Sequence, residues 1–206
     1  KSEELHRRMY NSTPAMLHSI NTKGELLSVS DAWLEKLGYT REEVIGRKSV
    51  EFLTEESQLR AEKALPHFFT TGCAKDVTYE MLTKDGRVLD VLLSATSERD
   101  GDGNIIRSLV AIHDITVLKN VQNALGASEE RFRTLVETVD EGIILQAASG
   151  EILHWNSFAS KVFGLLQNDV LGETSSSRDW GTIYEDGLPF PGKEHPSMKT
   201  LATGQP

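Results

Sequence analysis

The sequence predicts an α+β chain built from a five-stranded antiparallel sheet with short flanking helices, followed by a second, incomplete copy that a helix joins to the first. Three observations lead to this prediction. Residues 76–114 contain three alternating apolar segments separated by Asp-Gly turns, as antiparallel strands do. The second half repeats the landmarks of the first at a constant spacing, which indicates a duplication. Between the copies, apolar residues recur every three or four positions, as in a helix.

Local signals predict the first elements. Ser2–Tyr10 has the pattern of a short amphipathic helix. Two strands, Met16–Asn21 and Leu26–Val29, then form a hairpin around the turn at Lys23-Gly24.

Two short helices follow the hairpin. Ser30 or Asp31 begins the first helix, and Gly38 ends it. Thr40 begins a helical turn that ends at Gly46. These closely spaced glycines predict a tightly folded segment beside the hairpin.

A longer helix and three strands complete the first copy. Thr54 caps the helix, and Pro66 is expected to interrupt it. The predicted strands are Asp76–Thr83, Val88–Thr96 and Arg107–Asp114. Val88 and Leu92 make the second face of this sheet partly apolar, so we expect another surface to pack against it.

The connecting segment has the spacing of a coiled-coil seam, whose positions are Leu118, Val121, Leu125, Ser128, Phe132, Leu135 and Val139. One helix over residues 117–139 would extend about 35 Å. Two separate helices remain an alternative, because Gly126 disfavours a helix interior and Ser128 is a good helix start.

The duplication is visible at an offset of 126 residues, which aligns Gly24 with Gly150, Gly38 with Gly164 and Gly46 with Gly172. Near the end the offset becomes 132, with the extra residues in the loop 186–192. We therefore predict a first domain over 1–116, a helical linker over 117–131 and a second domain over 132–206. The second lacks counterparts of the last three strands, so we expect it to be frayed, completed by another chain, or completed by residues outside this sequence.

Composition excludes several classes of function. The 206 residues include 22 basic and 31 acidic side chains, a net charge of −9, which disfavours binding to nucleic acid or to an anionic membrane. One cysteine rules out an internal disulfide framework and fits a reducing, cytoplasmic location. There is no apolar run long enough to span a bilayer.

Three short motifs occur in order along the first half. Leu37-Gly38-Tyr39 with Glu42-Glu43-Val44-Ile45-Gly46 is followed by Lys84-Asp85-Gly86 and then by Asp114-Ile115-Thr116 before a helix. Residues 14–116 thereby resemble the PAS sensory domain family, and residues 132–206 resemble it more weakly. The resemblance implies tandem PAS domains with a PAS-like fold, from a bacterial signalling protein of the histidine kinase or diguanylate cyclase type. It also implies an ion pair between Glu43 and Lys84.

The resemblance implies a regulatory sensor region. It would relay a ligand- or partner-induced change through the helical linker to an output domain of the parent chain, outside this sequence. Asp114 and Thr116 are the candidate relay residues, because both can cap the helix that follows. Two alternatives stay open: a dimerisation and relay module that senses nothing, and a haem- or flavin-dependent gas or redox sensor.

The candidate ligand pocket lies between the sheet and its helices, and its residues are Trp33, Leu37, His67, Phe68, Tyr79, Met81 and Leu93. We expect a filled core without cofactor, with a small-molecule ligand as the alternative. His67 is the candidate axial ligand of a haem. Ser49 stands where flavin photosensors of the family carry a reactive cysteine, which excludes a photoadduct. Cys73 is either a redox-sensing thiol or a small, partly buried residue.

No catalytic or metal-binding pattern is present. The sequence lacks a phosphate-binding glycine loop, the histidine and asparagine boxes of a kinase, a cyclase signature and metal-ligand spacing. Kinase or cyclase activity would belong to the parent chain. The expected partner is a second copy of this chain, through the seam residues Leu118, Val121, Leu125 and Phe132 and the apolar backs of the sheets.

Overall fold

A computed structural model describes residue 10, residues 13–177 and residues 180–205. The chain divides into two compact units, Lys1–Asn123 and Ala124–Pro206, and each is described by itself. The helix predicted over Ser2–Tyr10 lies outside the described residues except for Tyr10. The predicted domain boundaries, with a linker over 117–131, stay a prediction.

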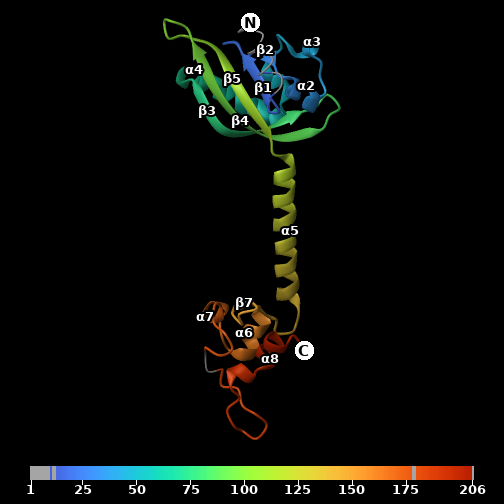
Figure 1. Ribbon diagram of the computed structural model, residues 1–206, viewed down its shortest axis with the longest axis vertical. Helices are drawn as coiled ribbons and strands as arrows, with labels where there is room; N and C mark the ends of the chain where they lie inside the picture. Colours follow the sequence, from blue (N-terminus) through green and yellow to red (C-terminus); the bar gives the residue numbers. More distant parts are fainter. Residues whose placement is uncertain (1–9, 11–12, 178–179, 206) are drawn as a thin grey trace. The chain divides into compact units, whose positions relative to one another are not determined.

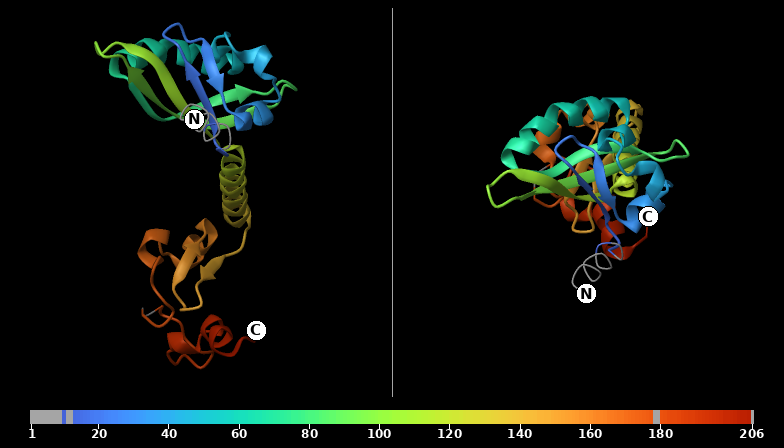
Figure 2. Two further views of the ribbon diagram at one scale, coloured as in Figure 1. Left: turned by 45° about the horizontal axis from the view of Figure 1, so that its top comes forward. Right: turned by 90° about the horizontal axis from the view of Figure 1, so that it is seen from above.

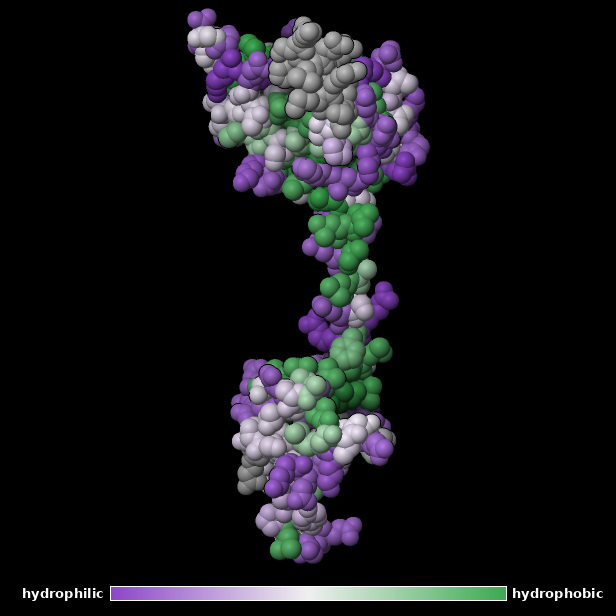
Figure 3. Space-filling model, viewed as in Figure 1, coloured by the Kyte–Doolittle hydropathy of each residue, from purple (hydrophilic) through white to green (hydrophobic). Residues whose placement is uncertain are grey.

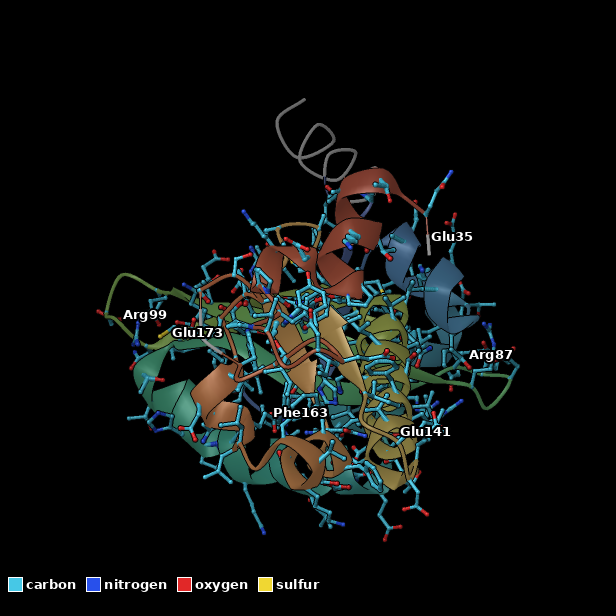
Figure 4. All side chains as sticks on the ribbon, turned by 90° about the horizontal axis from the view of Figure 1, so that it is seen from below. Glu35, Arg87, Arg99, Glu141, Phe163 and Glu173 are labelled. Carbon is cyan, nitrogen blue, oxygen red and sulfur yellow. The ribbon has the colours of Figure 1, made fainter. Side chains whose placement is uncertain are left out.

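The first unit contains the predicted five-stranded antiparallel sheet, in the order β2-β1-β5-β4-β3 (Figure 1). Its strands are β1 (Met16–Ile20), β2 (Leu26–Val29), β3 (Cys73–Leu82), β4 (Val88–Arg99) and β5 (Ile105–Asp114). β3 and β5 begin earlier in the sequence than predicted, and β4 ends later. Arg87 and Arg99, at the two ends of β4, lie at opposite edges of this unit (Figure 4).

The helices of this unit are α2 (Asp31–Leu37), α3 (Arg41–Val44), the 3-10 helix η1 (Ser49–Phe52) and α4 (Glu55–Thr71). α2 begins as predicted, because the Ser30 hydroxyl accepts a hydrogen bond from the Trp33 backbone N–H. It ends at Gly38, and Thr40 precedes α3. α4 lies along one face of the sheet (Figure 2).

The prediction that Pro66 interrupts its helix is wrong, because α4 runs from Glu55 to Thr71. Proline removes the N–H that would donate to the carbonyl four residues earlier, that of Glu62. Pro66 and Glu62 are both exposed, so water can hydrogen-bond the freed carbonyl. Phe68 anchors the last turn in the core, and Gly72 ends the helix with a left-handed φ of 81°.

The core lies between the sheet and the helices. Trp33 packs edge-on against Phe52, with 5.3 Å between the ring centroids. On the opposite face of the sheet, the side chains of Leu27, Val88 and Leu109 are between 46% and 48% exposed. The predicted partly apolar back is therefore present.

The connecting segment forms one helix, α5 (Thr116–Thr138), and not two separate helices. Its seam residues Leu118, Val121, Leu125 and Phe132 are each between 50% and 60% exposed, and hydrophobic surface follows the helix in Figure 3. Gly126 costs about 1 kcal/mol, which the favourable neighbouring residues of a helix of 23 residues outweigh.

The second unit repeats the first with a small, partial sheet. Its elements are β6 (Ile144–Gln146), β7 (Ile152–Trp155), α6 (Ser157–Phe163), α7 (Gln167–Val170), the 3-10 helix η2 (Gly192–Glu194) and α8 (Pro196–Thr203). β7, α6 and α7 follow β2, α2 and α3 at the predicted offset, and Gly204 ends α8 as Gly72 ends α4. The duplication is confirmed.

The two copies fill equivalent core positions by a compensating exchange of volume. The first copy has the small Val29 before α2 and the large Trp33 within it. The second has the large Trp155 and, four residues later, the small Ala159. All four side chains are at most 1% exposed, so the large and small side chains have changed places within equally closed cores.

Candidate functional site

A partly open cavity of about 350 Å³ lies between the sheet and the helices of the first unit. Strands β1, β3, β4 and β5 form one wall, and residues of α4 and η1 form the other. This volume falls in the range of small-molecule pockets. The expectation of a filled core is therefore wrong for this part of the interior.

Five of the seven residues predicted for the pocket line this cavity: His67, Phe68, Tyr79, Met81 and Leu93. Trp33 and Leu37 do not line it. They are 1% and 0% exposed, and belong to the packed part of the core beside α2.

His18 was missed by the sequence reasoning and lines the cavity from β1. It is 5% exposed, and its Nδ1 atom has no hydrogen-bond partner in the part of the chain that the structure describes. Burial lowers its pKa to about 4, because an apolar surrounding disfavours the charged imidazolium. The signal was the alternation of Met16, His18 and Ile20, which places His18 on the buried face of the strand.

The cavity wall carries no aspartate, glutamate, lysine or arginine among the described residues. Its polar side chains are those of His18, Ser49, His67, Cys73 and Tyr79. Burial raises the pKa of the Tyr79 phenol. At neutral pH the inner wall is therefore largely apolar.

The volume of the cavity is small for haem or a flavin nucleotide. Its volume of about 350 Å³ is roughly twice the ~150 Å³ that accommodates benzene, and so takes about a dozen non-hydrogen atoms. A porphyrin or an isoalloxazine with its ribityl phosphate has more atoms than this. His67, the candidate haem ligand, is also solvent-exposed.

Cys73 lies at the edge of this cavity, at the start of β3. Cys73 is exposed, so the expectation of a partly buried cysteine is wrong. A reagent in solution can therefore reach the thiol.

The junction between the sheet and α5 is held by hydrogen bonds that converge on Asp90 of β4. Its backbone N–H donates to the Thr116 hydroxyl at 2.9 Å, and its carbonyl accepts from the Ile115 N–H at 2.8 Å. Its carboxylate lies 2.6 Å from the Lys119 ammonium. The first turn of α5 is thereby tied to the strand that forms the cavity wall.

Asp114 completes the junction. Its carboxylate accepts a hydrogen bond from the Thr116 backbone N–H at 3.0 Å and pairs with Lys36 of α2, also at 3.0 Å. Burial favours the neutral acid, but the hydrogen bonds from Thr116 and Lys36 outweigh it and lower the pKa of Asp114. The two predicted relay residues therefore lie together.

The predicted ion pair between Glu43 of α3 and Lys84 of the β3–β4 turn is confirmed at 2.5 Å. Both side chains are at least 40% exposed, so the pair contributes little to stability. It is structural, and it lies outside the cavity wall.

The second unit has a hollow of about 360 Å³. Trp155 and Trp180, whose rings stack with centroids 6.1 Å apart, lie in its wall with residues of β6, β7 and the loop before α8. Its lining differs from that of the first cavity, in which no tryptophan takes part.

The family profile for the PAS domain matches residues 13–117. This chain belongs to the PAS domain family. A profile for the PAS fold also matches residues 130–177, so the two copies are tandem PAS domains.

An uncharacterized protein of Sinorhizobium fredii is 26% identical over 136 residues, which are 66% of this chain and 16% of that protein. The match to an RNA-binding light-oxygen-voltage receptor covers 61% of this chain and 37% of the receptor's chain, with 19% identity and a TM-score of 0.51. The match to a PAS domain from Colwellia psychrerythraea covers 56% of this chain and 98% of that domain's chain, with 15% identity and a TM-score of 0.50. These structural similarities show the fold alone.

PAS domains are signal-sensing modules rather than catalysts, which gives this chain a sensory or regulatory role. The described residues include no group of three or more histidine, cysteine, aspartate or glutamate side chains placed to hold a metal ion. None of the described helices is both long enough and apolar enough to cross a bilayer.

Proposed function

We propose that the first PAS domain senses a small molecule in its cavity and relays the binding event through α5 to an output domain of the parent chain, outside this sequence. The observation that carries this proposal is the position of β4. Val91 lines the cavity, and its neighbour Asp90 holds the first turn of α5.

The connection between cavity and helix is short. Val91 is fully buried and pairs with Asp114 across the sheet. A ligand that displaces Val91 would shift Asp90 and Asp114 together, and both hydrogen-bond to Thr116. Because packed interiors respond by discrete shifts, a small displacement there becomes a change at the start of the helix.

The exposed seam of α5 supports a homodimer. Leu118, Val121, Leu125 and Phe132 keep at least half of their surface in water, and a second α5 helix could bury them in coiled-coil packing. The partly apolar back of the sheet would add to this interface. Signal relay then becomes a change in how two helices pack, which an output domain of histidine kinase or diguanylate cyclase type can read.

A screen of small apolar molecules by thermal shift tests the sensing step. A ligand present at 100 times its Kd stabilises the folded domain by about 2.7 kcal/mol. Failure of every molecule to shift the melting temperature contradicts sensing through this cavity.

Hydrogen exchange tests the relay step. We expect a bound ligand to change amide exchange over residues 116–123, and we expect Thr116→Val to remove that change while binding persists. Thr138→Val is the matched control, because Thr138 lies at the other end of α5 and its hydroxyl donates within that helix. Exchange that does not respond to a bound ligand contradicts the relay.

A further inference from the structure

His18 is a polar group in an apolar wall. His18 is 5% exposed and lines the cavity, and its Nδ1 has no hydrogen-bond partner among the described residues. Leaving such a buried group unpaired is unfavourable. A ligand that lies against His18 and carries one hydrogen-bonding group can give the imidazole a partner.

The position of His18 in the sheet fixes where that hydrogen bond can form. β1 lies between β2 and β5, and His18 pairs with Val29 on one side and Val110 on the other. Its backbone is therefore held on both sides, so the imidazole cannot move far to find another partner.

The remaining wall sets the charge and size of the ligand. None of the described residues that line the cavity is an acid, a lysine or an arginine, so a buried ionic ligand would lose its hydration without gaining a counter-charge. The volume of about 350 Å³ takes about a dozen non-hydrogen atoms. A neutral imidazole offers one donor and one acceptor.

We propose that the cavity binds an uncharged, mainly apolar molecule of about a dozen non-hydrogen atoms that carries one hydroxyl or carbonyl group, and that His18 selects it by hydrogen-bonding to that group. This proposal deepens the proposed sensing function and rests on it. His18 is the specificity-determining residue.

Three probes of the same shape test the class of ligand: 2-naphthol, naphthalene and 2-naphthoate. Titration calorimetry on the full chain at pH 7.5 gives their affinities. We expect 2-naphthol to bind about tenfold more tightly than naphthalene, which is the contribution of one buried hydrogen bond, and 2-naphthoate to bind most weakly. Equal binding of the first two, tightest binding of 2-naphthoate, or no binding of any probe overturns the proposal.

Cys73 reports where the probe sits. It is the only cysteine of the chain, it is exposed, and it lies at the cavity edge. We expect bound 2-naphthol to slow the reaction of its thiol with a maleimide. An unchanged reaction rate at saturation would place the probe elsewhere and overturn the assignment.

Substitutions test the role of His18. We expect His18→Phe to bring the ratio of the two affinities close to one, and His18→Gln, which keeps a donor and an acceptor, to retain the preference for 2-naphthol. His113→Phe is the control, because His113 is an exposed histidine of the adjacent strand β5. A tenfold preference that survives in His18→Phe contradicts selection by His18.

The proposed class of ligand and the proposed relay can be refuted independently of each other. Binding with the expected ratio but without a change in exchange over residues 116–123 contradicts the relay alone. A change in exchange caused by 2-naphthoate or naphthalene, without the preference for 2-naphthol, supports the sensing function and overturns the role of His18.

Discussion

Acidification should destabilise the first PAS domain before its carboxylates titrate, because His18 must be neutral in the folded state. Its pKa is lowered from 6.5 to about 4 by burial. Between these values the unfolded chain binds the proton and the folded domain does not. The stability linked to His18 is therefore fully present above pH 6.5 and is lost as the pH falls toward 4.

The magnitude follows from the two pKa values. One pKa unit corresponds to about 1.36 kcal/mol, and the linkage relation gives a loss of about 2 kcal/mol between pH 7 and pH 5. Carboxyl groups with a lowered pKa, such as Glu43 and Asp85, have ordinary values of 4.5 and 3.8. They lose their stabilising effect as the pH falls further, so the window from pH 7 to pH 5 separates the effect of His18 from that of these carboxyl groups.

Hydrogen exchange of the buried amides of β4 and β5 measures the stability of the first unit alone. The free energies of opening at pH 7, 6 and 5, corrected for intrinsic exchange, are compared between the native chain, His18→Phe and His113→Phe. We expect the loss of about 2 kcal/mol in the native chain and in His113→Phe, and no such loss in His18→Phe.

A loss of the same size in His18→Phe would refute this reasoning, because the slope would then belong to another group. A native chain that is equally stable at pH 7 and pH 5 would show that His18 is hydrated or paired in solution. A pH-dependent opening confined to the second unit would also contradict it.

Three further predictions concern the helix seam, a helix end and the repeated core. Leu118→Asp should convert the proposed dimer to a monomer in sedimentation, because it places a charge in the seam. Asn123→Asp, on the opposite face of α5, should leave the dimer intact. A native chain that is monomeric at high micromolar concentration contradicts the dimer. Gly72→Ala should destabilise the first unit by about 2 kcal/mol, measured by urea unfolding, because φ is 81° and the added Cβ would lie 2.5 Å from the Ser97 hydroxyl oxygen. In the second unit, Trp155→Val should lower the free energy of unfolding by about 3 kcal/mol. Adding Ala159→Trp recreates the pair of side chains found in the first copy and should restore part of this stability. A double variant less stable than Trp155→Val alone would mean that the two cores are not equivalent.

The sequence predicted helix ends and turns well where a few neighbouring residues determine them. Ser30 and Gly38 bound α2, and the hairpin turn lies where Lys23-Gly24 predicted it. The repeat offset carried the same elements into the second unit, since capping and turn formation depend on a few neighbouring residues. Five of the seven pocket residues followed from the alternation along the strands and the position of α4.

The sequence by itself therefore determined the fold class and the tandem repeat of this PAS protein, and left open whether the connector is one helix or two. Only the tertiary structure decided that α4 continues through Pro66, that Trp33 belongs to the packed core, and that His18 lines a cavity while its Nδ1 has no hydrogen-bond partner among the described residues. The physical reason is that burial, cavity volume and the pairing of polar groups depend on side chains brought together from distant segments. No local pattern encodes the space that those segments leave between them.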